Sequence, residues 1–118
     1  MRILVVDDER VIRDLCNRAL ARAGHEVRVA SGIGEASGAV EGFEPEIVLT
    51  DLRLGDLDGL AVIRLVRERS PHARTVVMTG SDLPPEELSR VRAVHIDALI
   101  HKPFSIEELK EAVGVEAE

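Results

Sequence analysis

EIVLTDLRLGDLDGL, residues 46–60, is the stretch that decides the fold. It begins with an uncharged apolar run, residues 47–50, which is too short for a typical helix and predicts a buried strand. Asp51 ends that strand, turn-forming residues follow, and apolar residues at helical spacing resume at Leu60. Ligands bind at the carboxyl ends of strands in open α/β sheets, so Asp51 is a candidate for chemistry. An acid in this place can also simply cap the loop by accepting hydrogen bonds from backbone amides.

Length and composition predict one globular domain over residues 1–118. The chain is 45% hydrophobic and 31% charged, which suits a domain that buries a core. No apolar stretch is long enough to span a bilayer, and acids follow the first strand too soon for a signal peptide, so we expect a cytoplasmic protein with no membrane partner. The net charge of −7 and the absence of Trp and Tyr argue against nucleic-acid binding. The single cysteine, Cys16, is expected to be buried and unreactive.

Strand and helix patterns alternate five times along the chain. Further strands are predicted at residues 3–6, 27–29, 75–79 and 98–101, and an amphipathic pattern follows each strand. This alternation predicts an α/β fold with a five-stranded parallel sheet and helices on both faces.

Local signals refine this picture. Val27 and Val29 alternate with polar residues, so their strand should lie nearer the sheet edge. Ser105 and Glu108 form a capping box for the last helix. The second helix contains three glycines, at roughly 1 kcal/mol each relative to Ala, and should be the weakest. Three arginines of the third helix are expected on a solvated face: Arg64, Arg67 and Arg69.

All strands of a parallel sheet end at one edge, and the residues at those ends have complementary chemistry. They are Asp7, Asp8, Asp51, Thr79 and Lys102. Converging carboxylates repel one another unless a hard divalent cation lies among them, and Mg²⁺ suits oxygen ligands of this kind. Asp51 could then act as a nucleophile toward a phosphoryl group. Lys102 would supply a compact positive charge and Thr79 a hydroxyl hydrogen bond.

Four motifs resemble those of response-regulator receiver domains of two-component systems. They are ILVVDDE (3–9), TDLRLGDLDG (50–59), VVMTG (76–80) and HKPF (101–104). In this order and at these separations they cover essentially the whole chain. The resemblance implies a flavodoxin-like sheet with strand order 2-1-3-4-5. It also implies a signalling domain, not an enzyme beyond its own phosphorylation and dephosphorylation. A sensor histidine kinase or phosphotransfer protein would phosphorylate it, and it would change conformation to control an output.

The resemblance assigns roles to individual residues. Asp51 would be the phosphoacceptor, Thr79 the switch hydroxyl and Lys102 the phosphate-binding lysine. A cis peptide bond would precede Pro103. The implied Mg²⁺ ligands are Asp7, Asp8, Asp51 and the backbone carbonyl of Arg53.

Three positions depart from the family pattern. Leu99 occupies the place of a Tyr or Phe whose ring swings inward, so coupling from Thr79 to the outer surface should be altered or weaker. His95 replaces a Gly, and must either adopt a strained conformation or end its helix differently. Gly55 replaces a Pro and should loosen its loop.

Two other functions fit parts of the pattern. A degenerate receiver could act as a phosphorylation-independent protein-interaction module. The intact set of site residues counts against this alternative, whereas Leu99 favours it. A phosphatase of the haloacid dehalogenase type also uses an aspartyl phosphate, but it needs a second Asp two residues after the nucleophile, where this chain has Arg53.

Overall fold

The computed structural model describes residues 1–54, 57–80 and 84–114. The main strands are β1 (Arg2–Val6), β2 (Glu26–Ala30), β3 (Ile47–Asp51), β6 (Arg74–Thr79) and β7 (Ala98–His101). The helices are α1 (Arg10–Arg22), α2 (Ile33–Phe43), α3 (Gly59–Arg69), α4 (Pro85–Val94) and α5 (Ile106–Val113). A short antiparallel pair, β4 (Arg53–Leu54) and β5 (Leu57–Asp58), was not predicted. Gly55 lies outside the described residues.

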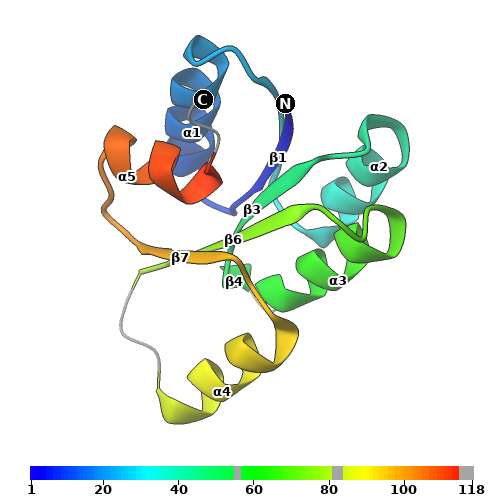
Figure 1. Cartoon of the computed structure of the whole chain (residues 1–118), viewed down its shortest axis with the longest axis vertical. Coiled ribbons are helices and arrows are strands. Elements are labelled where there is room, and N and C mark those ends of the chain that lie inside the picture. Colours follow the sequence, from blue (N-terminus) through cyan, green and yellow to red (C-terminus); the bar gives the residue numbers. More distant parts are fainter. Residues whose placement is uncertain (55–56, 81–83, 115–118) are drawn as a thin grey trace.

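The five main strands form one parallel sheet in the order β2-β1-β3-β6-β7. This is the predicted order 2-1-3-4-5, with the strand at Glu26–Ala30 at an edge as expected. Helices α1 and α5 cover one face of the sheet, and α2 and α3 cover the other (Figure 1). Among the described residues, no helix is both long and apolar enough to cross a membrane.

Alternation along the central strands creates two separate cores. Ile3 and Val5 face a cluster that includes Leu20 and Leu109, from α1 and α5. Leu4 and Val6 face the opposite cluster, with residues of α2 and α3. Because both faces are covered, β1 and β3 are continuous apolar runs and not alternating ones. Cys16 is fully buried in the first cluster, and burial raises the pKa of its thiol to about 12, consistent with the expected unreactive cysteine.

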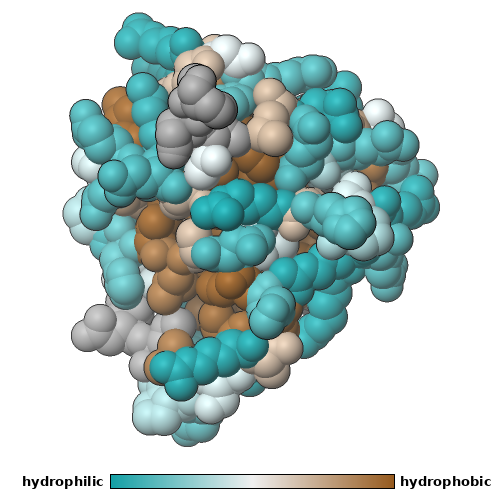
Figure 2. Space-filling model, in the orientation of Figure 1, coloured by the Kyte–Doolittle hydropathy of each residue, from teal (hydrophilic) through white to brown (hydrophobic). Residues whose placement is uncertain are grey.

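The edge strand β7 is the least covered part of the sheet. Ala98, Leu99 and Ile100 are only half-buried, and hydrophobic surface is visible over this strand between α5 and α4 (Figure 2). Leu99 packs against the core on the α2–α3 side. The position that the family fills with a ring therefore holds a smaller side chain in ordinary apolar contact.

The ends of α5 and α4 follow the sequence signals, and the prediction that Arg67 lies on a solvated face is wrong. Ser105 and Glu108 form both hydrogen bonds of the capping box. His95 ends α4 in the left-handed region, at φ 72°, so it adopts the strained of the two expected conformations. Arg67 does not lie on a solvated face: it is half-buried, and its guanidinium donates to the carbonyls of Val94 and His95. The end of α4 is thus secured by a side chain from α3 where a Gly is usual.

We expect His95→Gly to stabilise the domain by about 0.5–1 kcal/mol. Gly removes the left-handed penalty of roughly 1–2 kcal/mol, and its greater freedom in the unfolded chain offsets part of that gain. Urea unfolding measures the change. The control is Ala93→Gly at an exposed position inside α4, which should cost about 1 kcal/mol. Equal losses in the two variants would show that His95 carries no strain.

Candidate functional site

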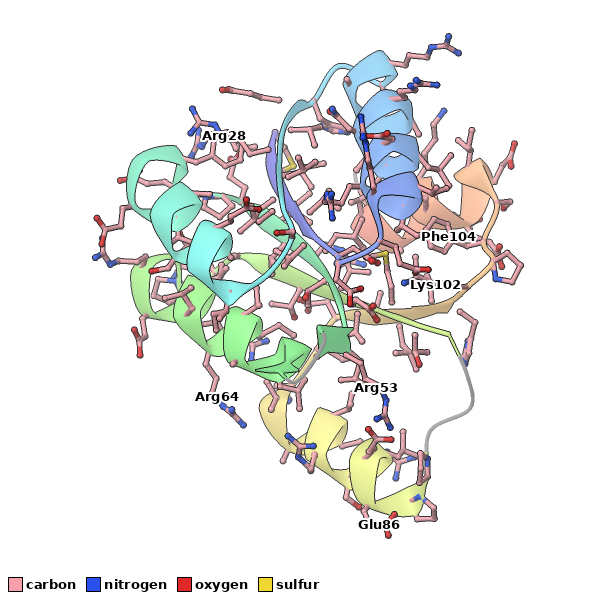
Figure 3. The ribbon with its side chains drawn as sticks, turned by 180° about the vertical axis from the view of Figure 1, so that it is seen from behind. Arg28, Arg53, Arg64, Glu86, Lys102 and Phe104 are labelled. Carbon is pink, nitrogen blue, oxygen red and sulfur yellow. The ribbon has the colours of Figure 1, made fainter. Side chains whose placement is uncertain are left out.

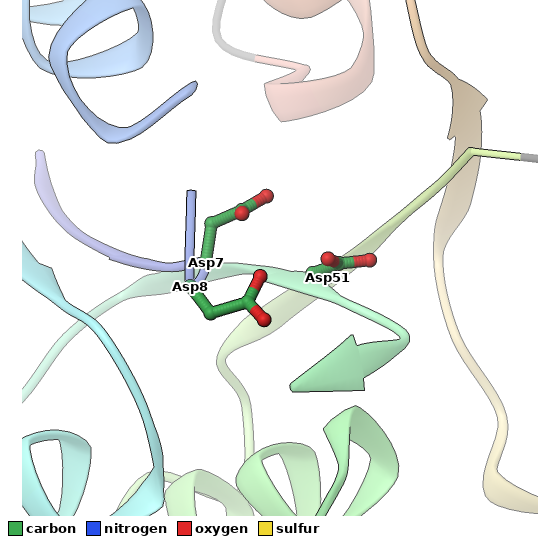
Figure 4. Close-up of side chains that lie close together, drawn as sticks. All are labelled: Asp7, Asp8 and Asp51. Carbon is green, nitrogen blue, oxygen red and sulfur yellow. The ribbon is translucent and has the colours of Figure 1, made fainter. Parts of the chain in front are cut away.

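The carboxyl edge of the sheet gathers three aspartates from two neighbouring strands. Asp7 and Asp8 follow β1, and Asp51 is the last residue of β3. One carboxylate oxygen of each lies within 4.8 Å of the others, and the three side chains converge (Figure 4). Asp7 is fully buried and Asp51 is 8% exposed, whereas Asp8 is open to solvent. The predicted grouping is therefore observed, with one face toward water.

Lys102 is the cation that forms ion pairs with the carboxylates of this group among the described residues. Its ammonium nitrogen lies 2.8 Å from Asp7 Oδ2 and 3.3 Å from Asp51 Oδ2. A third contact, 3.0 Å, joins it to Glu9 Oε1, which the sequence analysis did not include in the site. Burial lowers the pKa of Lys102, but the hydrogen bonds and charges of these acids outweigh it and raise the pKa above its usual value. Lys102 is therefore firmly cationic.

Burial of the Asp7 carboxylate is the energetically unfavourable part of this arrangement. Burial raises the pKa of its carboxyl group, and the contacts with Lys102 and the Glu9 amide, 2.8 Å from Oδ1, only partly oppose that effect. Oδ2 lies at ion-pair distance from Lys102 but has no aligned hydrogen bond among the described residues. A buried oxygen that lacks an aligned hydrogen bond and lies beside two other carboxylates would be stabilised by additional positive charge.

The residues present fit a hard cation such as Mg²⁺. They offer only oxygen ligands, they include the unsatisfied Asp7 Oδ2, and the exposed Asp8 leaves room for metal-bound water. Bound there, Mg²⁺ would supply charge neutralisation that one ammonium group cannot give to three aspartates and Glu9.

The backbone around Asp51 is held by close packing. The Gly59 amide donates to Leu52 O at 2.7 Å, and the Leu52 amide donates to Met78 O at 3.0 Å. A Cβ atom on Gly59 would lie 1.9 Å from the Asp51 carbonyl oxygen, so only glycine allows this approach. The first residue of α3 thus fixes the position of the Asp51 backbone.

Thr79 and Lys102 meet through the ends of β6 and β7. Thr79 is 4% exposed and pairs in register with His101. Its carbonyl accepts a 2.8 Å hydrogen bond from the Lys102 amide. The peptide bond from Lys102 to Pro103 is cis, as the family resemblance implied. The predicted residues Asp7, Asp8, Asp51, Thr79 and Lys102 therefore all lie at one edge of the sheet.

Arg53 behaves differently from the other predicted residues. Its amide lies 3.4 Å from Asp51 Oδ1, but its side chain extends away from the carboxylates to Glu87 of α4. The role of its backbone carbonyl stays a prediction. Glu9 and Glu87 were missed because neither ion pair follows from a strand-end position or a local spacing.

Comparison with known protein families identifies the family of this domain. The family model described as "Response regulator receiver domain" matches residues 3–114. The chain belongs to the response regulator receiver domain family. The domain is therefore a signalling module of two-component systems, as the four motifs predicted.

Individual relatives agree with this assignment. The transcriptional regulatory protein TrcR of Mycobacterium tuberculosis is 34% identical over 109 residues, which are 92% of this chain and 42% of TrcR. The chain thus spans less than half the length of this curated relative.

Two solved structures are similar to the whole domain. A CheY-like receiver domain protein from Methanospirillum hungatei has 27% identity and a TM-score of 0.84, with 96% of this chain and 90% of that chain covered. A response regulator from Burkholderia pseudomallei, solved with a phosphorylated aspartic acid, a calcium ion and citrate, has 30% identity and a TM-score of 0.84. That match covers 95% of this chain and 65% of the other.

We expect Gly59→Ala to destabilise the receiver domain by about 1–3 kcal/mol, since the added methyl group must displace the Asp51 backbone. Urea unfolding gives the change in free energy. Gly38→Ala is the matched control, because a Cβ there meets no described atom within 4 Å and Ala is favoured in a helix by about 1 kcal/mol. A neutral Gly59→Ala variant would contradict the close approach.

Proposed function

We propose that this chain is a single phosphoacceptor receiver domain over residues 1–118, in which Asp51 accepts a phosphoryl group with the help of Mg²⁺. The donor is a sensor histidine kinase or a phosphotransfer protein. The observation that carries the proposal is the contact of Lys102 with Asp51 at 3.3 Å, beside two further aspartates at the same sheet edge. Phosphorylation then shifts the domain between two conformations that control an output.

The proposed reaction uses residues in distinct roles. An Asp51 carboxylate oxygen attacks the phosphorus atom of the donor phosphohistidine, forming an acyl phosphate while the P–N bond breaks and the donor imidazole leaves. Lys102 holds a positive charge next to the accepting carboxylate and binds the phosphoryl oxygens. Thr79 would hydrogen-bond the phosphoryl group from the end of β6. Mg²⁺, held by Asp7, Asp8, Asp51 and the Arg53 carbonyl, would neutralise negative charge.

The added charge explains why phosphorylation can act as a switch. A phosphoryl group brings about 1.5–2 negative charges to an edge where one ammonium group already contacts three acids. Lys102 must then divide its interactions among the phosphoryl oxygens, Asp7 and Glu9. Contacts at this edge therefore change with the phosphorylation state.

Support for the phosphorylated residue type comes from a relative. The Burkholderia pseudomallei response regulator, at 30% identity, was crystallised with a phosphorylated aspartic acid and a calcium ion. We propose the cytoplasm as the location, and an effector domain or protein of unknown identity as the output. The receiver domain itself is proposed to contact neither nucleic acid nor membrane.

The alternatives gain less support from the site. An interaction module without phosphorylation has no need of a buried Asp7 and a lysine shared among acids, both of which are destabilising unless paired. In a dehalogenase-type phosphatase a second aspartate would follow Asp51 by two residues. Arg53 occupies that position and extends toward α4.

The test is mass spectrometry of the intact protein after incubation with acetyl phosphate and Mg²⁺. We expect one added phosphoryl group in the parent and none in Asp51→Asn, because the amide cannot form the acyl phosphate. Circular dichroism of both proteins establishes that they are folded. A folded parent that gains no phosphate would exclude the phosphoacceptor and favour the interaction module.

We expect phosphorylation to change residues 88–109 little, because Leu99 has no ring to move inward and already packs against the core. Chemical-shift mapping with and without beryllofluoride measures the response. Leu99→Tyr offers a comparison, with larger shifts over the same residues if the missing ring limits the coupling. Large shifts throughout residues 88–109 of the parent would refute this prediction.

A further inference from the structure

Helix α4 is the helix with the fewest buried side chains among those the structure describes. Of residues 85–94, only Val91 is fully buried, and the others are half-buried or exposed. In Figure 1, α4 also lies farther from the sheet than the other helices. Apolar packing therefore stabilises this helix weakly, and polar contacts at its two ends carry more of its attachment.

The C-terminal end of α4 is attached to the body of the domain by Arg67. The Arg67 guanidinium donates to the carbonyls of Val94 and His95, and it also lies 3.2 Å from the Thr75 hydroxyl of β6. One side chain thus joins α3, β6 and the end of α4. None of these contacts involves the aspartate cluster.

The N-terminal end of α4 is attached instead to the phosphorylation site. Nη2 of Arg53 donates to both carboxylate oxygens of Glu87, at 2.7 and 2.6 Å. Figure 3 shows Arg53 extending from β4 toward α4. Glu87 lies in the first helical turn, where a carboxylate also interacts favourably with the helix dipole. Its side chain is 19% exposed, whereas that of Arg53 is 70% exposed.

Arg53 is close enough to Asp51 for a second anion to compete for it. It follows Asp51 by two residues, and its amide is 3.4 Å from Asp51 Oδ1. A phosphoryl group on Asp51 carries about two charges and three strong acceptor oxygens, more than the single charge of Glu87. The Arg53 side chain is 70% exposed, so solvent surrounds most of it and it can turn toward this second anion when it releases Glu87.

We propose that the Arg53–Glu87 ion pair fastens the first turn of α4 to the phosphorylation site, and that phosphorylation of Asp51 draws Arg53 away and loosens that turn. This inference rests on the proposed function. The loosening is confined to the N-terminal turn, since Arg67 continues to hold the other end. It supplies a route from Asp51 to α4 that does not pass through Thr79 or Leu99.

Hydrogen exchange of the Leu88 amide, which donates to the Pro84 carbonyl at 2.9 Å and so reports on the first turn of α4, tests the tether, with mass spectrometry recording phosphorylation of the same samples. Without phosphate, Glu87→Gln should exchange about two- to fivefold faster than the parent, in line with the loss of an exposed ion pair. Glu86→Gln is the matched control: it removes the same charge from the same turn, but Glu86 has no ion pair among the described residues. It should exchange at the parent rate.

Phosphorylation provides the second comparison. The phosphorylated parent should reach the exchange rate of unphosphorylated Glu87→Gln. Phosphorylation of Glu87→Gln should not raise its exchange rate any further. A phosphorylated parent with unchanged exchange, or an equal increase in both Glu variants, would overturn the tether and leave the phosphoacceptor intact. A parent that takes no phosphate would overturn both, and the mass spectrum distinguishes the two failures.

Discussion

The ammonium group of Lys102 offsets the negative charge that the fold concentrates at the carboxyl edge of the sheet. It contacts Asp7, Glu9 and Asp51, which come from distant parts of the sequence. Without it, the fully buried Asp7 would face Asp51 with no opposing charge. One lysine does not neutralise this many acids, and the remaining excess of negative charge would favour the proposed binding of Mg²⁺ at this edge.

Parallel topology explains why these residues meet at all. Every strand of the sheet ends at one edge, so residues 7, 51, 79 and 102 become neighbours although each lies at or just after the end of a different strand. The same topology requires helices on both faces, which buries all of β3 and all of β1 except Arg2. The rigid core then holds Asp51 in place, and the close contact of Gly59 with its carbonyl fixes the loop beyond it.

Much of this arrangement follows from local sequence patterns, and the remainder depends on tertiary contacts. Strand order came from the family resemblance. The apolar runs indicated most of the strands, and the alternation of Val27 and Val29 with polar residues indicated the edge position of β2. The patterns did not reveal Glu9 at Lys102, because an acid that begins a helix ordinarily faces water. They placed Arg67 on a solvated face, since the carbonyls that it caps belong to another helix. Residue type indicates which chemistry is possible, but the partners of long side chains depend on the tertiary structure.

The attachment of α4 shows how a weakly packed element can remain placed and still respond. Its apolar face buries one residue fully, so the hydrophobic contribution is small. Two arginines, Arg67 and Arg53, compensate for this small hydrophobic contribution by attaching the ends of the helix. They differ in which groups can compete for their hydrogen bonds. Arg67 donates to backbone carbonyls, which do not change with signalling, whereas Arg53 binds a carboxylate near a group that phosphorylation would make more negative. A charge added at Asp51 therefore acts on one end of the helix only, and this asymmetry makes a local response compatible with the absence of a switching ring at Leu99.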